Sequence, residues 1–462
     1  MSLEPRIVKE SFGEIEPYGV HAVAYFYGRL FAENPRLRTL FPPAMDLQHD
    51  RLFHALTTLV WSLDSPGSMT SYLSRLGRGH RRFGVRPEHF PALRSALLAT
   101  LRRFSGRAWS PEAEAAWAAA FDAAAEIMIA AAERDAAQAP PWWVAEVVEH
   151  ERRTHDIAVL TLRPGEPLRF AAGQHVTVQT ARWPRIWRPY SVANAPRPDG
   201  LLRLHVRAVP GGWVSGTLVR HTGAGDTLLL GPALGGMTPP ADPSRDLLLV
   251  AGGTGLAPLR AIIEQAVAGG RRRETHLLLA ARTERDLYDL PELRRLEASS
   301  PWLHVIPVLS DAPEPGPLPK HSPPSEHGPL PVHGPLPDHG SLAEHGPPPE
   351  RSPLLESGAP SGCGGVRDDG RPHGAAVAEA LGRLGDWPGH EVYIAGPTGM
   401  VRAVTARLQD LGVPPERIHH DLCEAVQQEE ALRRARHLPA ADGDGHQPAR
   451  ARRNSEVVTS AG

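Results

Sequence analysis

The sequence predicts a multidomain protein in which an all-α domain is followed by an antiparallel β-barrel and then by a parallel-sheet α/β domain. Three observations predict this order: apolar residues at helical spacing over 1–139, alternating β-type runs over 140–241, and strand–turn–helix units over 242–427. The chain has 462 residues, and at about 150 residues per domain this length fits three folded units.

Composition narrows the class of protein before any motif is considered. Hydrophobic residues make up 41% and charged residues 22% of the chain, which is typical of a globular protein. The net charge of −2 gives no electrostatic reason to expect nucleic acid or an anionic membrane as a partner. The two cysteines are too few for a disulfide framework, and the N-terminus lacks the apolar stretch of a signal peptide. No segment approaches the roughly 20 apolar residues that span a bilayer, so we expect a cytoplasmic protein without stable membrane insertion.

The predicted all-α domain covers residues 1–139. Apolar residues recur there every three or four positions, which places them on one face of a helix. Pro111 suits the first turn of the last helix, because that position has no helical hydrogen bond to lose. The segments with this spacing are 23–31, 52–63, 93–104 and 111–128.

Short alternating runs replace the helical pattern over residues 140–241. They read VAEVV, IAVLTL, HVTVQ, LLRLHVRAV and TLLLG, and turns that contain Gly or Pro separate them. This pattern predicts a small antiparallel barrel or sandwich.

Buried strands alternate with helices over residues 242–427, which is typical of a parallel sheet covered by helices on both faces. Two segments, an insertion over 311–372 and a tail over 428–462, have too little apolar content to form a core, and we predict that they are disordered. A glycine turn after the first strand would let the backbone approach a pyrophosphate, which the start of the next helix would bind. The turn reads Gly253-Thr254-Gly255-Leu256-Ala257-Pro258.

A spaced set of segments in the first domain resembles the globin domain of bacterial flavohaemoglobins. The set comprises FYGRLFAENPRLRTLF (26–41), QHDRLFHAL (48–56), His80, FGVRPEHF (83–90) and Trp117. The resemblance implies a haem b group whose iron is ligated by His80, since imidazole leaves the opposite coordination position open for a diatomic gas. It also implies that Tyr27 and Gln48 donate hydrogen bonds to the bound oxygen.

The residues expected on the histidine side of the haem depart from the family pattern. The family usually has a tyrosine and a glutamate that orient the histidine and raise its electron donation. Phe90 stands at the tyrosine position and Ala132 at the glutamate position, with Glu133 one residue away as the candidate acid. Gly79 replaces the lysine that often precedes the ligand, so weaker support of His80 is expected.

Two further elements resemble the flavin domains of ferredoxin reductases. Arg188-Pro189-Tyr190-Ser191 matches the Arg-x-Tyr-Ser motif and follows a strand that begins at Gly173-Gln174-His175. The resemblance implies that Arg188 neutralises the FAD pyrophosphate, Tyr190 packs against the flavin ring and Ser191 bonds near its reactive nitrogen. The second flavin element runs over 211–215, with Gly212, Val214 and Ser215 at the pyrophosphate and Arg207 as an assisting cation.

The same reductases suggest the remaining nucleotide contacts. Gly396 and Pro397 match the second nicotinamide motif, and the segment around Asp421 and Cys423 matches the one that caps the flavin. Cys423 stands where the family usually has an aromatic ring. Arg282 and Arg285 can contact a 2′-phosphate or remain solvated, so both NADH and NADPH stay open as donors.

Together these resemblances imply that electrons pass from NAD(P)H through FAD to haem, and that the haem combines O2 with nitric oxide to give nitrate. The alternatives are a globin-based oxygen or redox sensor, a divergent reductase with another electron donor or acceptor, and a haem-free reductase. We expect a monomer or weak dimer.

Overall fold

The computed structural model describes residues 4–43, 45–239, 244–270, 273–310 and 373–420. These residues belong to one compact unit. The predicted disordered insertion and tail lie outside them, so both remain predictions.

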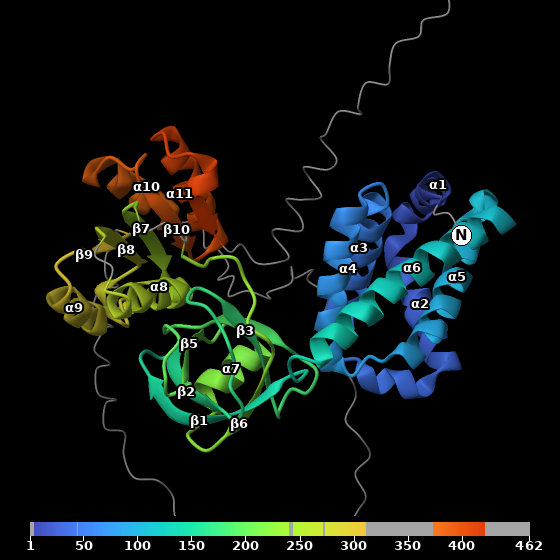
Figure 1. Cartoon of the computed structure of the whole chain (residues 1–462), viewed down its shortest axis with the longest axis horizontal. Coiled ribbons are helices and arrows are strands. Elements are labelled where there is room, and N and C mark those ends of the chain that lie inside the picture. The colour runs from blue at the N-terminus through green and yellow to red at the C-terminus, as the bar shows by residue number, and fades with distance from the viewer. Residues whose placement is uncertain (1–3, 44, 240–243, 271–272, 311–372, 421–462) are drawn as a thin grey trace, which may run out of the picture. The chain divides into compact units, whose positions relative to one another are not determined.

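The N-terminal domain is all-helical, as predicted, and its six α-helices pack together (Figure 1). Short 3-10 turns join several of them. The helices are α1 Pro5–Ile15, α2 Gly19–Glu33, α3 Asp46–Ser62, α4 Pro66–His80, α5 Phe90–Phe104 and α6 Pro111–Ala136.

Local sequence explains where α6 begins and how it is anchored. Pro111 occupies its first turn, and Ser110 Oγ accepts a hydrogen bond from the Ala113 amide at 3.2 Å. Further along, Trp117 is buried in the domain core and donates from Nε1 to Ser11 Oγ of α1 at 2.8 Å. The start of the last helix is therefore as the sequence predicts.

The expectation that no segment is apolar enough to span a bilayer was wrong for α6. This 26-residue helix has a mean hydropathy of 1.4 over its most apolar window, because alanine dominates its composition. It is the one such helix among the described residues. Its buried residues include Trp117 and Ala120, which belong to the globular core of the domain.

The second domain is an antiparallel sheet of six strands with the order β4-β3-β6-β1-β2-β5. An isolated bridge between Val192 and Leu204 joins the two ends of this order, so the sheet is nearly closed and the predicted barrel is confirmed. The elements are β1 Trp143–Arg152, β2 Ile157–Pro164, β3 His175–Thr180, β4 Arg188–Ser191, β5 Leu202–Arg207, α7 Trp213–Arg220 and β6 Thr227–Leu230.

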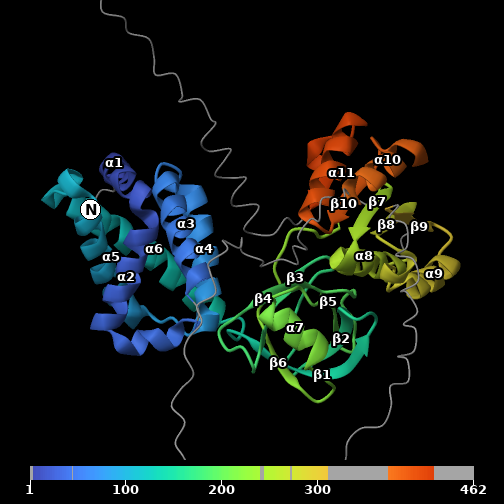
Figure 2. The ribbon, with the colours of Figure 1, turned by 180° about the vertical axis from the view of Figure 1, so that it is seen from behind.

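The third domain is the predicted parallel sheet, with the order β11-β10-β7-β8-β9. Helices α8 and α9 lie on one side of it, and α10 and α11 lie on the other (Figure 2). The elements are β7 Leu247–Gly252, α8 Leu256–Ala268, β8 Thr275–Ala281, α9 Leu290–Ser299, β9 Leu303–Leu309, α10 His373–Leu384, β10 Glu391–Ala395, α11 Thr398–Asp410 and β11 Ile418–His420.

The barrel and the parallel sheet share a buried core. Ile157 and Val159 of β2 belong to the same apolar cluster as Leu259 and Ile262 of α8. Burial of these side chains removes apolar surface of both domains from water, which stabilises their contact. The strands that carry the flavin motifs and the helix that follows the glycine turn are therefore parts of one packed structure.

Candidate functional site

His80 is the last residue of α4 and has one ring nitrogen fixed by the backbone. Its Nδ1 lies 2.7 Å from the carbonyl oxygen of Leu76. A carbonyl oxygen only accepts hydrogen bonds, so Nδ1 carries the proton and the neutral ring keeps a lone pair on Nε2. Burial lowers the pKa of His80, which favours this neutral form. The ring is thus in the form that haem iron requires of a histidine ligand.

A cavity of about 360 Å³ opens beside His80. Its lining includes Phe90 and Ala132, two of the positions at which the sequence departs from the family pattern, and Glu133, the candidate replacement acid. The phenyl ring offers no hydrogen-bond donor and the methyl group no acceptor. Among the described residues, the carbonyl of Leu76 is the one hydrogen-bond partner of the histidine ring.

Tyr27 and Gln48 form a second cluster, and neither lines the cavity beside His80. Tyr27 is 4% exposed, and the rings of Phe31 and His49 stack on it at centroid distances of 5.7 and 5.3 Å. Burial raises the pKa of Tyr27 to about 12, although a hydrogen bond with the Gln48 side chain works in the opposite direction. The phenol therefore stays protonated at neutral pH and can donate a hydrogen bond.

Strand pairing places the Arg188–Ser191 motif beside the strand that begins at His175. In the β3–β4 register, His175 pairs with Ser191 and Val176 pairs with Tyr190. Burial raises the pKa of the Tyr190 phenol, so this ring stays neutral. Gly173, at the turn before β3, has a φ of +89°, and a Cβ there would overlap the Met237 carbonyl oxygen. Glycine is required at this turn for both reasons.

The second flavin element forms the start of α7. Gly211 has a left-handed φ of +70°, and a Cβ at Gly212 would overlap Ser215 Oγ. The Ser215 hydroxyl accepts the Val209 amide at 3.3 Å, which fixes the turn. Val214, in the first turn of α7, is buried. The backbone amides at this helix start have no helical acceptor, which suits a phosphate group.

Arg207 lies beside the dinucleotide turn. Its Nε donates to Asp156 Oδ2 at 2.8 Å, and its Nη1 would be 3.1 Å from a Cβ built on Gly253. The sequence assigned Arg207 to the flavin pyrophosphate, and that role remains a prediction. The geometry gives this cation a position next to the turn of the third domain.

The glycine turn and the second nicotinamide motif meet where the strand order reverses. The turn Gly253–Gly255 follows β7, and Gly396 and Pro397 follow the adjacent strand β10. A Cβ on Gly255 would overlap the Ala395 carbonyl oxygen, so the two turns touch backbone to backbone. Nucleotides bind at such a switch point in open parallel sheets. Thr254 lies inside the turn, and Leu256, Ala257 and Pro258 form the first turn of α8.

Asp421 and Cys423 lie outside the described residues, so their role at the flavin remains a prediction. The histidines His419 and His420 just before them form the edge strand β11, which the sequence pattern did not indicate.

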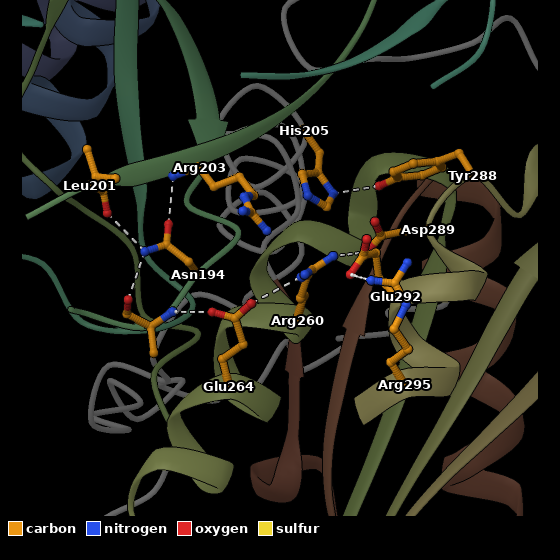
Figure 3. A network of polar contacts seen from close by, with 11 residues as sticks. Asn194, Leu201, Arg203, His205, Arg260, Glu264, Tyr288, Asp289, Glu292 and Arg295 are labelled. Atoms are coloured by element: carbon orange, nitrogen blue, oxygen red, sulfur yellow. Dashed lines mark hydrogen bonds and ion pairs between the residues drawn. The ribbon is translucent and has the colours of Figure 1, made fainter. Parts of the chain in front are cut away.

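Sequence reasoning missed a buried network between the barrel and α8 (Figure 3). Its centre is Arg260, which is 4% exposed and pairs with Asp289 and Glu264. His205 of β5 reaches Tyr288 in the same network. A single arginine followed four residues later by glutamate, inside the apolar run LAPLRAIIEQAV, is the sequence feature that could have indicated it.

Comparisons with known proteins agree with the three-domain order. Residues 24–128 match the globin family, residues 144–237 match the oxidoreductase FAD-binding domain, and residues 249–317 match the oxidoreductase NAD-binding domain. A flavohemoprotein of Bordetella pertussis is 30% identical over 297 residues, which cover 60% of this chain and 73% of that protein. The chain belongs to the flavohaemoprotein family. As a flavohaemoprotein it is an NAD(P)H-dependent flavo-haem oxidoreductase whose cofactors are haem, FAD and a nicotinamide dinucleotide.

Other similar proteins share parts of this flavohaemoprotein or its fold. The ferredoxin–NAD(P)(+) reductase component of a naphthalene 1,2-dioxygenase system from Pseudomonas putida is 36% identical over 167 residues, which cover 36% of this chain and 50% of that protein. The crystal structure of a flavohemoglobin from Malassezia yamatoensis, with bound FAD and heme, has a TM-score of 0.62 at 16% identity. It covers 90% of this chain and 97% of its own, so the fold is shared over nearly the whole length.

Proposed function

We propose that this flavohaemoprotein is a nitric oxide dioxygenase, which takes electrons from NAD(P)H and converts nitric oxide and O2 to nitrate. The observation that carries the proposal is the buried Tyr27 phenol, which burial keeps protonated, which hydrogen-bonds the half-buried Gln48 side chain and which lies against the rings of Phe31 and His49. O2, nitric oxide and NAD(P)H are the proposed partners, and a cytoplasmic location with a monomeric or weakly dimeric chain completes the proposal.

Residues of the globin domain would bind the iron and hydrogen-bond its gas ligand. When bound, haem supplies an iron that takes a diatomic gas, and FAD accepts a hydride and releases single electrons. His80 would hold the iron through Nε2 while Leu76 fixes the ring. Tyr27 would donate to the gas ligand, whose distal atom is partly anionic, and such a charge-assisted bond contributes about 1.5–3 kcal/mol. Gln48 would orient the phenol and act as a second donor.

The residues of the reductase domains would bind and align the two nucleotides. Arg188, Tyr190 and Ser191 on β4, with the start of α7, suit FAD. The glycine turn before α8, with Gly396 and Pro397, suits the nicotinamide dinucleotide. Their adjacency in one packed structure supports transfer of a hydride from the nicotinamide to the flavin.

A second candidate function is an oxygen or redox sensor. The observation that favours it is the cavity beside His80, where, within the described part of the chain, Phe90 and Ala132 add no hydrogen-bonding partner to the Leu76 carbonyl. A histidine whose ring N–H is bonded to a neutral carbonyl donates less electron density to iron than one bonded to a carboxylate. Gas binding without fast turnover would then be the task of the domain.

One experiment on the full-length protein separates these functions. The visible spectrum is recorded before and after anaerobic addition of NADH or NADPH, and O2 and then nitric oxide are added. Loss of the flavin band, a shift of the haem Soret band and rapid loss of nitric oxide would support the dioxygenase. A reduced haem that leaves nitric oxide unconsumed would support the sensor, and a protein without a Soret band would exclude both.

A further inference from the structure

The buried network around Arg260 joins the flavin strand to the helix of the dinucleotide turn. Arg260 lies on α8, four residues after the first residue of the helix, which is about 6 Å along its axis. Its Nε lies 3.2 Å from Glu264 Oε1, and its Nη1 pairs with Asp289 Oδ2. Because a buried charge is costly unless it is paired, the two carboxylates fix the guanidinium in place.

Glu264 carries the connection into the barrel. Its Oε2 accepts a hydrogen bond from the Ala195 amide at 3.3 Å. Ala195 lies four residues after Ser191, the last residue of β4 and of the flavin motif. The carboxylate of Glu264 therefore bonds at once to α8, through Arg260, and to the segment that leaves the flavin strand (Figure 3).

The segment that Glu264 contacts is held by further hydrogen bonds. Asn194 is 1% exposed, and its Nδ2 donates to the carbonyl oxygens of Ala195 and Leu201 at 2.8 and 3.0 Å. Its Oδ1 accepts the Arg203 amide at 2.6 Å. Asn194 thus ties the segment after β4 to Leu201 and to Arg203 of β5, so the backbone that Glu264 contacts is held by hydrogen bonds on its far side as well.

A second, parallel link reaches the same corner of the third domain. His205 Nδ1 of β5 lies 2.8 Å from the hydroxyl of Tyr288, the neighbour of Asp289. Residues 288 and 289 therefore hold β5 through one side chain and α8 through the other (Figure 3).

We propose that Glu264 and Arg260 are positioning residues for hydride transfer, because they fix the spacing between the flavin strand and the dinucleotide turn. This inference rests on the proposed transfer of electrons from NAD(P)H to FAD. In that step a C–H bond of the nicotinamide breaks and an N–H bond of the flavin forms, and the electron pair moves with the hydrogen, so the nicotinamide is oxidised and the flavin is reduced. The reaction requires the two rings to lie close and aligned, and small displacements are costly.

The test compares full-length protein with Glu264→Ala and Glu264→Gln, loaded with FAD and mixed anaerobically with NADH or NADPH in a stopped-flow instrument. We expect Glu264→Ala to lower the limiting rate of flavin reduction at least 10-fold. The nucleotide concentration that gives half of that rate should change less than 3-fold. The long-wavelength charge-transfer absorbance, which reports stacking of nicotinamide on flavin, should also be lost. Glu264→Gln retains the acceptor for the Ala195 amide and should recover part of both signals.

Glu292→Ala is the matched control, because Glu292 forms an ion pair with the exposed Arg295 on α9 and lies near the same network (Figure 3). It should reduce flavin at the parent rate. A parent-like rate and charge-transfer band in Glu264→Ala would overturn the inference. If Glu264→Ala does not fold or retain FAD, a parent-like rate and band in Glu264→Gln would overturn it instead. Failure of the parent itself to reduce flavin with either nucleotide would instead reject the proposed function.

Discussion

At the residue scale, the environment of a side chain decides which chemistry it can perform. Tyr27 and His80 show opposite uses of burial. Burial keeps the Tyr27 phenol protonated and able to donate, with a pKa of about 12. Burial and the Leu76 carbonyl keep His80 neutral and able to accept through Nε2. Neither property can be read from residue type alone.

Tyr27→Phe should weaken O2 binding without loss of haem. Removal of the donor costs about 1.5–3 kcal/mol, so the O2 dissociation rate of the reduced protein should rise at least 10-fold in a flash-photolysis measurement. Tyr25 lies on the same helix as Tyr27, and its ring packs on Phe104 of α5. Tyr25→Phe is therefore the control and should dissociate O2 like the parent. Equal rates in both variants would show that Tyr27 does not reach the gas ligand.

At the element scale, the packing of each strand of the reductase domains decides whether its sequence pattern could predict it. Alternating burial along β1 and the fully buried β7 agree with the sequence prediction, since side-chain periodicity follows from which face of a strand is covered. β4 was recognised as a motif and not as a strand, because its four residues include proline and are ordered by pairing with β3.

The Arg260 network shows why part of the site was beyond sequence reasoning. Arg260 and Asp289 are 29 positions apart, and Glu264 meets Ala195 across 69 positions. Such pairs arise from tertiary packing, which no local pattern encodes. The glycine turns, in contrast, were predicted because a backbone that must approach a phosphate closely requires glycine at a fixed place after a strand.

Gly255→Ala should block the nicotinamide site, because the added Cβ would overlap the Ala395 carbonyl and separate the turns after β7 and β10. We expect NAD(P)H-driven flavin reduction to slow at least 10-fold, whereas dithionite should still reduce the flavin. Gly223→Ala serves for comparison, since a Cβ there meets no atom within 4 Å. Parent-like reduction of Gly255→Ala by NADH and NADPH would contradict the role of this turn.

The reductase should lose stability in mild acid because of His205. Burial, and then the nearby Arg260, hold the pKa of His205 well below 6.5. Below about pH 6.5 the unfolded chain binds a proton that the folded chain excludes, so the free energy of unfolding falls as pH falls, by up to about 1.4 kcal/mol per pH unit for one proton.

His205→Gln should reduce this pH dependence. Urea unfolding followed by FAD fluorescence at pH 7.5, 6.5 and 5.5 should give a shallower slope for the variant than for the parent. His221→Gln, at an exposed histidine after α7, is the control and should keep the parent slope. A parent slope in His205→Gln would mean that His205 is protonated in the folded protein.

At the scale of the whole molecule, the globin domain and the barrel each have an apolar core of their own, whereas the core of the parallel sheet includes Ile157 and Val159 of the barrel. The globin core contains Phe12 and Trp117, and the barrel core contains Leu160 and Leu204. Loss of haem should therefore leave the two reductase domains folded, since the globin core is separate from theirs.

His80→Ala should separate the two half-reactions of the protein. We expect loss of the Soret band and of nitric oxide consumption, with NAD(P)H-dependent reduction of ferricyanide retained within about 2-fold, because the reductase cores and glycine turns are untouched. His21→Ala, at an exposed position of α2, should retain both activities. A Soret band of full intensity in His80→Ala would mean that another residue ligates the iron.

The contact of Gly255 with the Ala395 carbonyl also bears on coenzyme engineering. Because the turns after β7 and β10 leave no volume for a side chain there, selection for a changed preference between the two dinucleotides must act elsewhere. The next positions along the same sheet edge follow β8, which ends at Ala281 and is succeeded by Arg282 and Arg285. A library that varies those two arginines, with both turns held constant, is the direct way to obtain a variant that uses the other coenzyme.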